Sequence, residues 1–390
     1  MYVKEPEGCV TSYTYNALGL VLTETDPLGN VISYEYDMLG QTTARTDALG
    51  NRMAFSYTAD GQIASVTDAE GNITRYTYDA CGNLIQTEDA MGSIVQYAYD
   101  AMNNQIRECL SVSGEQSCIT LYQYDKKGRM IKEINPLLEE KVYTYDGNDN
   151  LTVYQDEEQK EIAVRYDLND QPVSIAYSDD RRAAFRYNKR GELVEMSDWN
   201  GTVSLERDSV GRLTKVTDHH DRVTGYAYDA AGNRTGISYP DGSAAAYAYD
   251  KNNRLVSVTD GEEKSAQYTY DAAGNMTFFT GPAGSVSYTY NANRQPVGMA
   301  YRLGESTVME ERLTYDRTGR ITSSERTGSS PELTGSADYG YDSNELMVYE
   351  TGAGSIRSVF GHSYECLSET VTSETQAAGT ETASGSPVPE

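Results

Sequence analysis

The sequence contains few of the large side chains that fill a conventional hydrophobic core. Among 390 residues there are 1 Trp and 5 Phe against 33 Tyr, and hydrophobic residues make up 38% of the chain. A tyrosine ring buries a large area, but its hydroxyl needs water or a hydrogen-bond partner, so tyrosine suits a thin sheet better than a thick aliphatic core. Together with 34 Gly, this composition favours an all-β protein.

Basic residues are also scarce, because 32 Lys and Arg stand against 59 Asp and Glu, for a formal net charge of −27. Such a surface repels nucleic-acid phosphates and anionic lipid headgroups, so we expect no nucleic-acid partner. No stretch approaches the roughly 20 apolar residues of a membrane-spanning helix. No basic segment followed by an apolar one precedes Tyr13, so neither membrane insertion nor a signal peptide within this chain is expected.

A tyrosine pattern recurs along almost the whole chain. Aligned on the second Tyr of Tyr-x-Tyr-Asp, about sixteen copies follow one another, mostly at steps of 21 residues. A period in this range indicates an array of supersecondary units in place of one single-core domain. The aligned positions are Tyr15, Tyr36, Tyr57, Tyr78, Tyr99, Tyr124, Tyr145, Tyr166, Tyr187, Arg207 in a degenerate copy, Tyr228, Tyr249, Tyr270, Tyr290, Tyr315 and Tyr341.

A second pattern, Asp-x-x-Gly, divides each period into two halves, as at Asp26–Gly29, Asp37–Gly40 and Asp47–Gly50. The Asp can accept backbone N–H groups of the turn that it opens, and the Gly supplies the left-handed residue of a bulged hairpin connection. Where Gly is missing, Asn often replaces it, as at Asn103 and Asn253, because Asn also tolerates positive φ. Each unit therefore contains two turns and two strands.

The segments between turns are about six or seven residues long, and Tyr76 and Tyr78, two residues apart, project from one face of a strand. No segment shows sustained helical periodicity, so no helix is expected. The predicted fold is an all-β array of tandem hairpins, about 21 residues each, in one continuous antiparallel sheet.

Three copies, YTYDACGN at 76–83, YAYDAAGN at 226–233 and YTYDAAGN at 268–275, resemble the YD repeats of the RHS family. That family includes bacterial polymorphic toxins, insecticidal toxin-complex subunits and teneurins, and the resemblance covers roughly residues 10–350. It implies that the hairpin strip spirals into a hollow shell, which in the bacterial toxins encloses a C-terminal toxic domain. The signature residues that carry the resemblance are Tyr76, Tyr78, Asp79, Gly82, Tyr226, Tyr228, Asp229, Gly232, Tyr268, Tyr270, Asp271 and Gly274.

The repeat pattern divides the chain into four parts. Residues 1–10 are interpreted as a partial repeat or leader, 11–350 as the repeat array, 351–366 as a transition segment and 367–390 as a disordered tail rich in Ser, Thr and Glu. The core segment at which several family members cleave themselves has no counterpart here, and no toxin domain follows, so neither activity is expected of this chain.

A size estimate predicts an open or partial shell. About 32 strands at ~4.8 Å spacing form a ribbon of roughly 150 Å by 24 Å, or about 3,600 Å². A guest of about 100 residues has a diameter near 34 Å. A wall about 5 Å outside that guest needs roughly 6,000 Å², so the ribbon covers about half of it.

No catalytic, cofactor or metal site is predicted. His219 and His220, between Asp218 and Asp221, occupy a turn slot and are interpreted as solvated turn residues. A glycine phosphate loop, a nucleophile elbow and a zinc cysteine pattern are all missing from the sequence. The repeat argues for a structural protein and against an enzyme.

Cys109 and Cys118 are a candidate disulfide. If Ser113 and Gly114 form a two-residue turn, the two cysteines lie directly opposite each other in a closely spaced antiparallel pair. Either a bridge or two free thiols is compatible with the sequence, and a bridge would favour an oxidising, extracellular setting.

The leading functional hypothesis is a structural scaffold within an exported or cell-surface RHS-type protein, linked by resemblance to toxin encapsulation or contact-dependent competition. Its partners would be the remainder of a longer RHS chain or an enclosed toxin domain. The alternative is an adhesion module that binds carbohydrate or protein through exposed tyrosine rows.

Overall fold

The computed structural model describes residues 1–112, 115–261, 265–344, 347–352 and 355–359. Over these residues the chain forms one 34-stranded sheet, in which each strand pairs antiparallel with the next strand in sequence. The one helical element described is a short 3-10 turn, η1 (Pro331–Leu333), and no described helix is long and apolar enough to cross a membrane. The all-β hairpin prediction is confirmed.

The strands are β1 (Tyr2–Lys4), β2 (Val10–Tyr15), β3 (Val21–Thr25), β4 (Val31–Tyr36), β5 (Thr42–Thr46), β6 (Arg52–Tyr57), β7 (Ile63–Thr67), β8 (Ile73–Tyr78), β9 (Leu84–Glu88), β10 (Ile94–Tyr99), β11 (Gln105–Val112), β12 (Glu115–Tyr124), β13 (Met130–Ile134), β14 (Glu140–Tyr145), β15 (Leu151–Gln155), β16 (Glu161–Tyr166) and β17 (Pro172–Tyr177). They continue with β18 (Arg182–Tyr187), β19 (Leu193–Asp198), β20 (Gly201–Arg207), β21 (Leu213–Thr217), β22 (Val223–Tyr228), β23 (Arg234–Ser238), β24 (Ala244–Tyr249), β25 (Leu255–Asp260), β26 (Ser265–Tyr270), β27 (Met276–Gly281), β28 (Gly284–Tyr290), β29 (Pro296–Leu303), β30 (Ser306–Tyr315), β31 (Ile321–Gly328), β32 (Gly335–Tyr341), β33 (Met347–Gly352) and β34 (Ser355–Val359).

The turn that follows the second tyrosine has the predicted chemistry, as Asp229 shows. Its N–H donates to the carbonyl of Asn233 (2.9 Å), and the N–H of Gly232 donates back to the Asp229 carbonyl (3.2 Å). The Asp229 carboxylate accepts the Asn233 N–H (2.8 Å) and the Asn233 side-chain amide (2.9 Å). Gly232 has φ 94°, the left-handed conformation expected at the fourth position. The composition of the turn therefore dictates its geometry.

Each such turn leads into a bulge. Between β22 and β23, Ala227 lies opposite Gly236, but Tyr228 lies opposite Arg234, so β23 contributes one extra residue. A bulge of this kind bends the strand and strengthens the local twist. The same shift recurs at the equivalent position of the neighbouring hairpins, between Thr77 and Tyr78 for example, so the bending accumulates along the strip.

The tyrosines and the aliphatic residues share one face of the sheet. Tyr226 lies opposite Ile237 on this face, while Ala227 and Gly236 lie on the other. Tyr268 and Phe279 pack here with ring centroids 5.3 Å apart. No large side chain among the described residues is fully buried, so the wall is one layer thick and has no conventional core.

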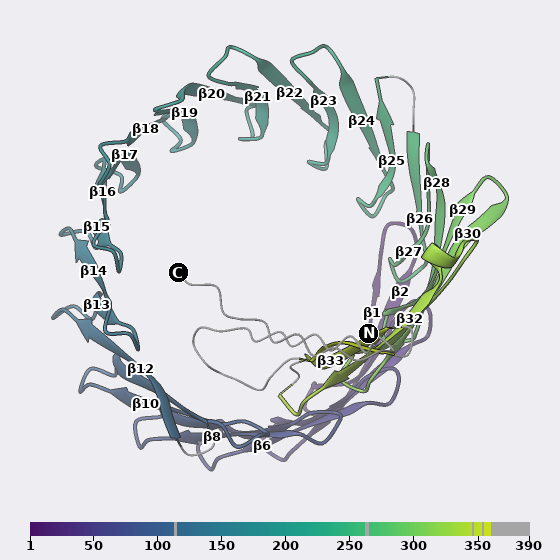
Figure 1. The fold of residues 1–390 in the computed structure, drawn as a ribbon, viewed down its shortest axis with the longest axis horizontal. Helices are drawn as coiled ribbons and strands as arrows, with labels where there is room; N and C mark the ends of the chain where they lie inside the picture. The colour runs from purple at the N-terminus through teal and green to yellow at the C-terminus, as the bar shows by residue number, and fades with distance from the viewer. Residues whose placement is uncertain (113–114, 262–264, 345–346, 353–354, 360–390) are drawn as a thin grey trace, which may run out of the picture.

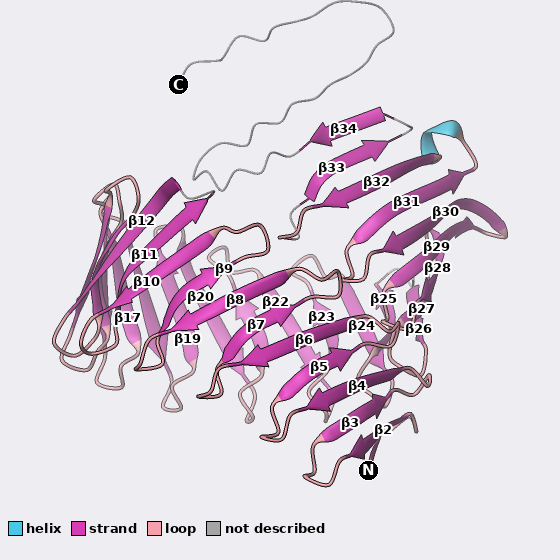
Figure 2. Cartoon of the chain, turned by 90° about the horizontal axis from the view of Figure 1, so that it is seen from below, coloured by secondary structure: helices cyan, strands magenta, loops and turns pink. Residues whose placement is uncertain are grey.

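The strip winds round an interior until its two ends overlap (Figures 1 and 2). We call the edge formed by the turns after each second tyrosine the tyrosine rim, and the edge formed by the alternate turns the opposite rim. Opposite-rim turns at 5–8, 26–29, 47–50, 68–71 and 89–92 meet tyrosine-rim turns of residues 250–344. We call this line of contact the seam.

The predicted openness is confirmed, because over the described residues β1 pairs with β2 alone and β34 with β33 alone. β1 lies within residues 1–10, which the sequence analysis interprets as a partial repeat or leader, and β34 lies within residues 351–366, the predicted transition segment. The predicted tail, residues 367–390, lies outside the described residues.

Substitutions at the fourth turn position test this geometry. Gly232→Val should destabilise the protein by about 1–2 kcal/mol, because a β-branched residue resists positive φ. Leu138 occupies the equivalent opposite-rim position at φ 65° and is 80% exposed, so Leu138→Gly should stabilise by about 0.5–1 kcal/mol. Urea unfolding measures both changes, and equal midpoints for wild type and both variants would refute the turn assignment.

Candidate functional site

From Tyr36 onward, the second tyrosine of a repeat clamps the preceding repeat. The hydroxyl of Tyr228 donates to the carbonyl of Leu213 (2.8 Å), and that of Tyr270 donates to the carbonyl of Leu255 (2.7 Å). The acceptor is always the first residue of the strand after the previous bulge, where the ladder is interrupted. The clamp therefore joins two hairpins at the point where their strand pairing is weakest.

Among the described residues fourteen of these clamps are present, with oxygen–oxygen distances of 2.6–3.0 Å: Tyr36 to Val21, Tyr57 to Thr42, Tyr78 to Ile63, Tyr99 to Leu84, Tyr124 to Gln105, Tyr145 to Met130, Tyr166 to Leu151, Tyr187 to Pro172, Tyr228 to Leu213, Tyr249 to Arg234, Tyr270 to Leu255, Tyr290 to Met276, Tyr315 to Pro296 and Tyr341 to Ile321.

The degenerate copy keeps the clamp with a different side chain. Arg207 donates from Nε to the carbonyl of Leu193 (3.4 Å) and from a guanidinium nitrogen to the carbonyl of Gly211 (3.1 Å). What the repeat requires at this position is a long side chain with a terminal donor. The sequence pattern identified the position but gave no sign of the acceptor.

The Asp and Gly residues of the signature build the turns of the tyrosine rim. Asp79 accepts the side-chain amide of Asn83 (3.0 Å) and the N–H groups of Asn83 and Cys81 (both 2.9 Å). The Asn83 side chain also donates to Asn103 in the next turn along the rim (2.9 Å). The hydrogen bonds from Asn83 and the neighbouring backbone lower the pKa of Asp79, so this acid stabilises a turn as a carboxylate.

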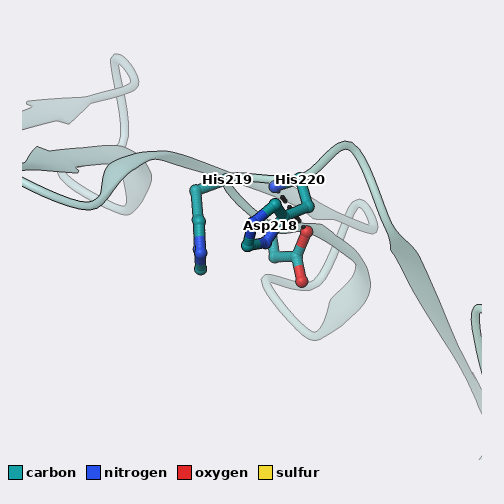
Figure 3. A group of neighbouring side chains, drawn as sticks. All are labelled: Asp218, His219 and His220. Atoms are coloured by element: carbon teal, nitrogen blue, oxygen red, sulfur yellow. Dashed lines mark hydrogen bonds between the residues drawn. The ribbon is translucent and has the colours of Figure 1, made fainter.

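The histidine pair forms a cluster with Asp218, in which one possible ligand atom from each residue lies within 4.8 Å of the others (Figure 3). The two imidazole centroids are 4.0 Å apart. The carboxylate of Asp218, however, already accepts Arg222 Nε (2.8 Å) and the N–H groups of His220 (2.9 Å) and Arg222 (3.0 Å). A cation at this place would have to displace the Arg222 guanidinium, so the cluster is better described as a turn.

The cysteine prediction needs a correction. Cys109 lies opposite Ile119, and Cys118 lies opposite Leu110, because the register shifts by one residue between Leu110 and Ser111. Cys109 and Cys118 therefore project to opposite faces of the sheet. The expectation of directly opposed cysteines is wrong, and a bridge would require the hairpin to change register. The predicted turn residues, Ser113 and Gly114, lie outside the described residues.

A polar cleft of about 410 Å³ lies at the seam, lined by the acids Glu24, Asp26 and Asp47 and by Arg45 and Arg294 among others. Asp26 is only 9% exposed. Burial opposes its ionisation, but hydrogen bonds from Asn30 and the turn backbone, with the charge of Arg294, lower its pKa overall. Asp26 and Asp47 are thus already engaged across the seam, by Arg294 and Asn293. Sequence reasoning identified both acids as turn residues but did not identify their partners across the seam.

The fold defines the class of this protein as a shell-type repeat scaffold. The Teneurin YD-shell family matches residues 98–245, and the RHS Repeat family matches residues 15–52, 57–90 and 249–277. The chain belongs to the RHS/YD-repeat family.

Two sequence relatives share part of the array. The "tRNA3(Ser)-specific nuclease WapA" of Bacillus spizizenii is 29% identical over 136 residues, and the "tRNA nuclease WapA" of Bacillus subtilis strain 168 is 27% identical over 136 residues. In both cases the match covers 32% of this chain but only 6% of the relative. The shared region is thus a small piece of each nuclease.

Two solved structures have a similar fold. The crystal structure of TcdB2–TccC3 without the hypervariable C-terminal region matches with a TM-score of 0.59, and that of TcdB2–TccC3–Cdc42 matches with 0.58. Each comparison covers 88% of this chain and 23% of the other, at 14% identity. At this identity the likeness establishes the fold alone.

Removing one clamp hydroxyl should weaken the sheet locally. We expect Tyr228→Phe to lower the free energy of unfolding by about 1 kcal/mol, because the Leu213 carbonyl loses its donor. Tyr226→Phe is the matched control, since Tyr226 is the first tyrosine of the same strand. Chemical denaturation of both variants gives the difference, and an equal loss in Tyr226→Phe would argue against the clamp.

The clamps also predict a pH limit. Burial raises the pKa values of Tyr78, Tyr99 and Tyr315 above 10.0, so their stabilisation is complete below pH ~10 and is lost as the pH rises through the raised values. The hydrogen bonds from Asn83 and Asn233 lower the pKa values of Asp79 and Asp229, so that stabilisation is present above the ordinary value of 3.8 and is lost at lower pH. Urea unfolding between pH 3 and 11 should show a plateau that falls at both ends. Constant stability from pH 8 to 11 would contradict the tyrosine assignment.

Proposed function

We propose that this chain is a section of the wall of an RHS-type shell that encloses a polypeptide. The observation that carries the proposal is the winding of a one-layer strip around an interior (Figure 1). A wall of one layer offers little depth for a catalytic site, but it can enclose a volume with few residues. The family membership and the TcdB2–TccC3 likeness support the same conclusion.

The seam gives an estimate of the enclosed width. Its contacts at Asn252, Asn293 and Arg317 join residues 246 or 247 positions apart, which corresponds to between eleven and twelve repeats of two strands. At ~4.8 Å per strand the circumference is about 110 Å and the mean diameter about 36 Å. Subtracting about 5 Å of wall on each side leaves at least ~26 Å, and strand tilt widens this further. A chain segment or a small domain fits such a space.

The partners of this wall are, in the proposal, the remainder of a longer RHS-type chain and an enclosed toxin domain. The wall section of this chain matches only 6% of the two WapA proteins, which are named as tRNA nucleases. A wall that keeps a nuclease or similar toxin from its own cell would serve an exported or cell-surface protein in contact-dependent competition. We propose this setting for the chain.

The alternative of an adhesion module has weaker support. It depends on exposed tyrosine rows, but the hydroxyls of the second tyrosines are already bound to the neighbouring repeat. These rings are consequently fixed as structural elements and offer little hydrogen bonding to a glycan.

Size-selective labelling tests the enclosed interior. Ala245 and Ala246 are neighbours on β24 whose side chains lie on opposite faces of the sheet. In a background with the native cysteines replaced by serine, Ala245→Cys and Ala246→Cys are each labelled with N-ethylmaleimide and with a long polyethylene-glycol maleimide. We expect the long reagent to be strongly slowed, relative to the small one, at only one of the two positions. Equal relative rates at both positions would refute an enclosed space.

A further inference from the structure

Three tyrosine-rim turns of the late repeats carry asparagine at their third position: Asn252, Asn293 and Asn344. Asn293 reaches across the seam to the turn at 47–50. Its side-chain oxygen accepts the N–H of Ala48 (3.1 Å), and its amide nitrogen donates to Oδ2 of Asp47 (2.6 Å). One side chain thus engages both the acid that opens the facing turn and the backbone of that turn.

The same arrangement occurs at a second, separate position. Asn252 accepts the N–H of Glu7 (3.1 Å) and donates to the carboxylate of Glu5 (2.6 Å), the residue that opens the turn at 5–8. A side-chain amide suits this role because it both donates and accepts hydrogen bonds without carrying charge. At the far end of the seam, Asn344 donates to the carboxylate of Asp89 (2.6 Å). The repetition indicates a built contact.

Arg294, the residue after Asn293, adds a second contact across the seam, although its backbone adopts a φ that is unfavourable for arginine. Arg294 occupies the fourth position at φ 62°, where most turns of this rim have glycine, and its guanidinium lies 3.3 Å from Oδ2 of Asp26. Leu138 adopts a similar φ of 65° at the fourth position of another turn while 80% exposed, so the turn itself holds this conformation. What Arg294 adds is a positive charge beside Asp26 across the seam.

We infer that the third-position asparagines form a latch that keeps the strip wound, and that the shell can open along the seam while its strand ladder stays intact. The seam bonds described here run from side chains to turns, and over the described residues no strand of the early repeats pairs with a strand of the late ones. Breaking the latch therefore costs only side-chain contacts. The inference rests on the proposed wall, for which the seam would be the opening line.

The chain offers a matched control. Asn148 and Asn169 also occupy third positions of tyrosine-rim turns, between β14 and β15 and between β16 and β17. Figure 1 shows these strands in a single winding of the strip. Asn148 donates within its own rim to Asp170 (2.9 Å). The pair Asn148→Ala/Asn169→Ala thus loses a rim bond without losing one across the seam. Alanine is acceptable at this position, because Ala231 and Ala273 occupy it in other turns.

The experiment compares the full chain carrying Asn252→Ala/Asn293→Ala with that control, by hydrogen exchange at the amides of Glu7 and Ala48. These amides donate to the two asparagines. We expect their exchange to accelerate by about tenfold or more, since hydrogen bonds to two charged groups are lost with the latch. Exchange in the β-strands and the circular dichroism should stay unchanged. Unchanged exchange at Glu7 and Ala48, or the same acceleration in the control, would overturn the inference.

A second experiment exchanges the amide and the carboxylate between positions 293 and 47, and it remains informative if the alanine variant loses structure. Asn293→Asp places a second carboxylate against Asp47 and should speed exchange at Ala48, whereas Asn293→Asp/Asp47→Asn restores an amide opposite a carboxylate and should slow it again. No recovery in the double variant would contradict the latch. The labelling of Ala245 and Ala246 uses the unsubstituted seam, so the latch can fail while the proposed wall stands.

Discussion

The fold depends on one interaction, the hydrogen bond from the hydroxyl of the second tyrosine to a backbone carbonyl of the preceding repeat, which recurs from Tyr36 to Tyr341. In a sheet of one layer there is little apolar burial to hold hairpins at a fixed angle. A half-buried ring with a polar end supplies burial and direction together. Because its acceptor lies at the bulge, where strand pairing is interrupted, the same contact repairs the ladder and fixes the bend. The replacement of tyrosine by Arg207 in one repeat shows that the donor, more than the ring, is what the position requires.

The curvature that makes an enclosure possible follows from this local chemistry. Asp, Gly and Asn at the turn produce a bulge in each repeat, the bulge bends the strand, and the tyrosine holds the bend. Repeated along the chain, the bend brings the opposite rim of the early repeats against the tyrosine rim of the late ones. The seam is therefore a consequence of repeat geometry. The bend of the backbone brings the two rims together, and the side-chain contacts of the seam then stabilise that arrangement.

Sequence reasoning predicted the parts of this structure that repeat. The period of 21, the Asp-x-x-Gly turns and the shared face of Tyr76 and Tyr78 predicted the all-β hairpin array, because local patterns determine local structure. Contacts between residues about 247 positions apart, such as Asn252 with Glu5, were out of reach, because their partners depend on how far the strip bends in total. The disulfide geometry was wrong for a related reason: one extra residue in β12 reverses the face of a side chain, and bulges outside the repeat pattern leave no signature.

The account's central claim is that one continuous sheet curls round an interior, and small-angle X-ray scattering of the purified chain tests it most directly. A straight ribbon of 34 strands at ~4.8 Å spacing would be roughly 160 Å long, with a radius of gyration above about 40 Å. The wound strip should instead give a value below about 30 Å, given a mean diameter near 36 Å. A radius of gyration above about 40 Å for the monomer would contradict the account.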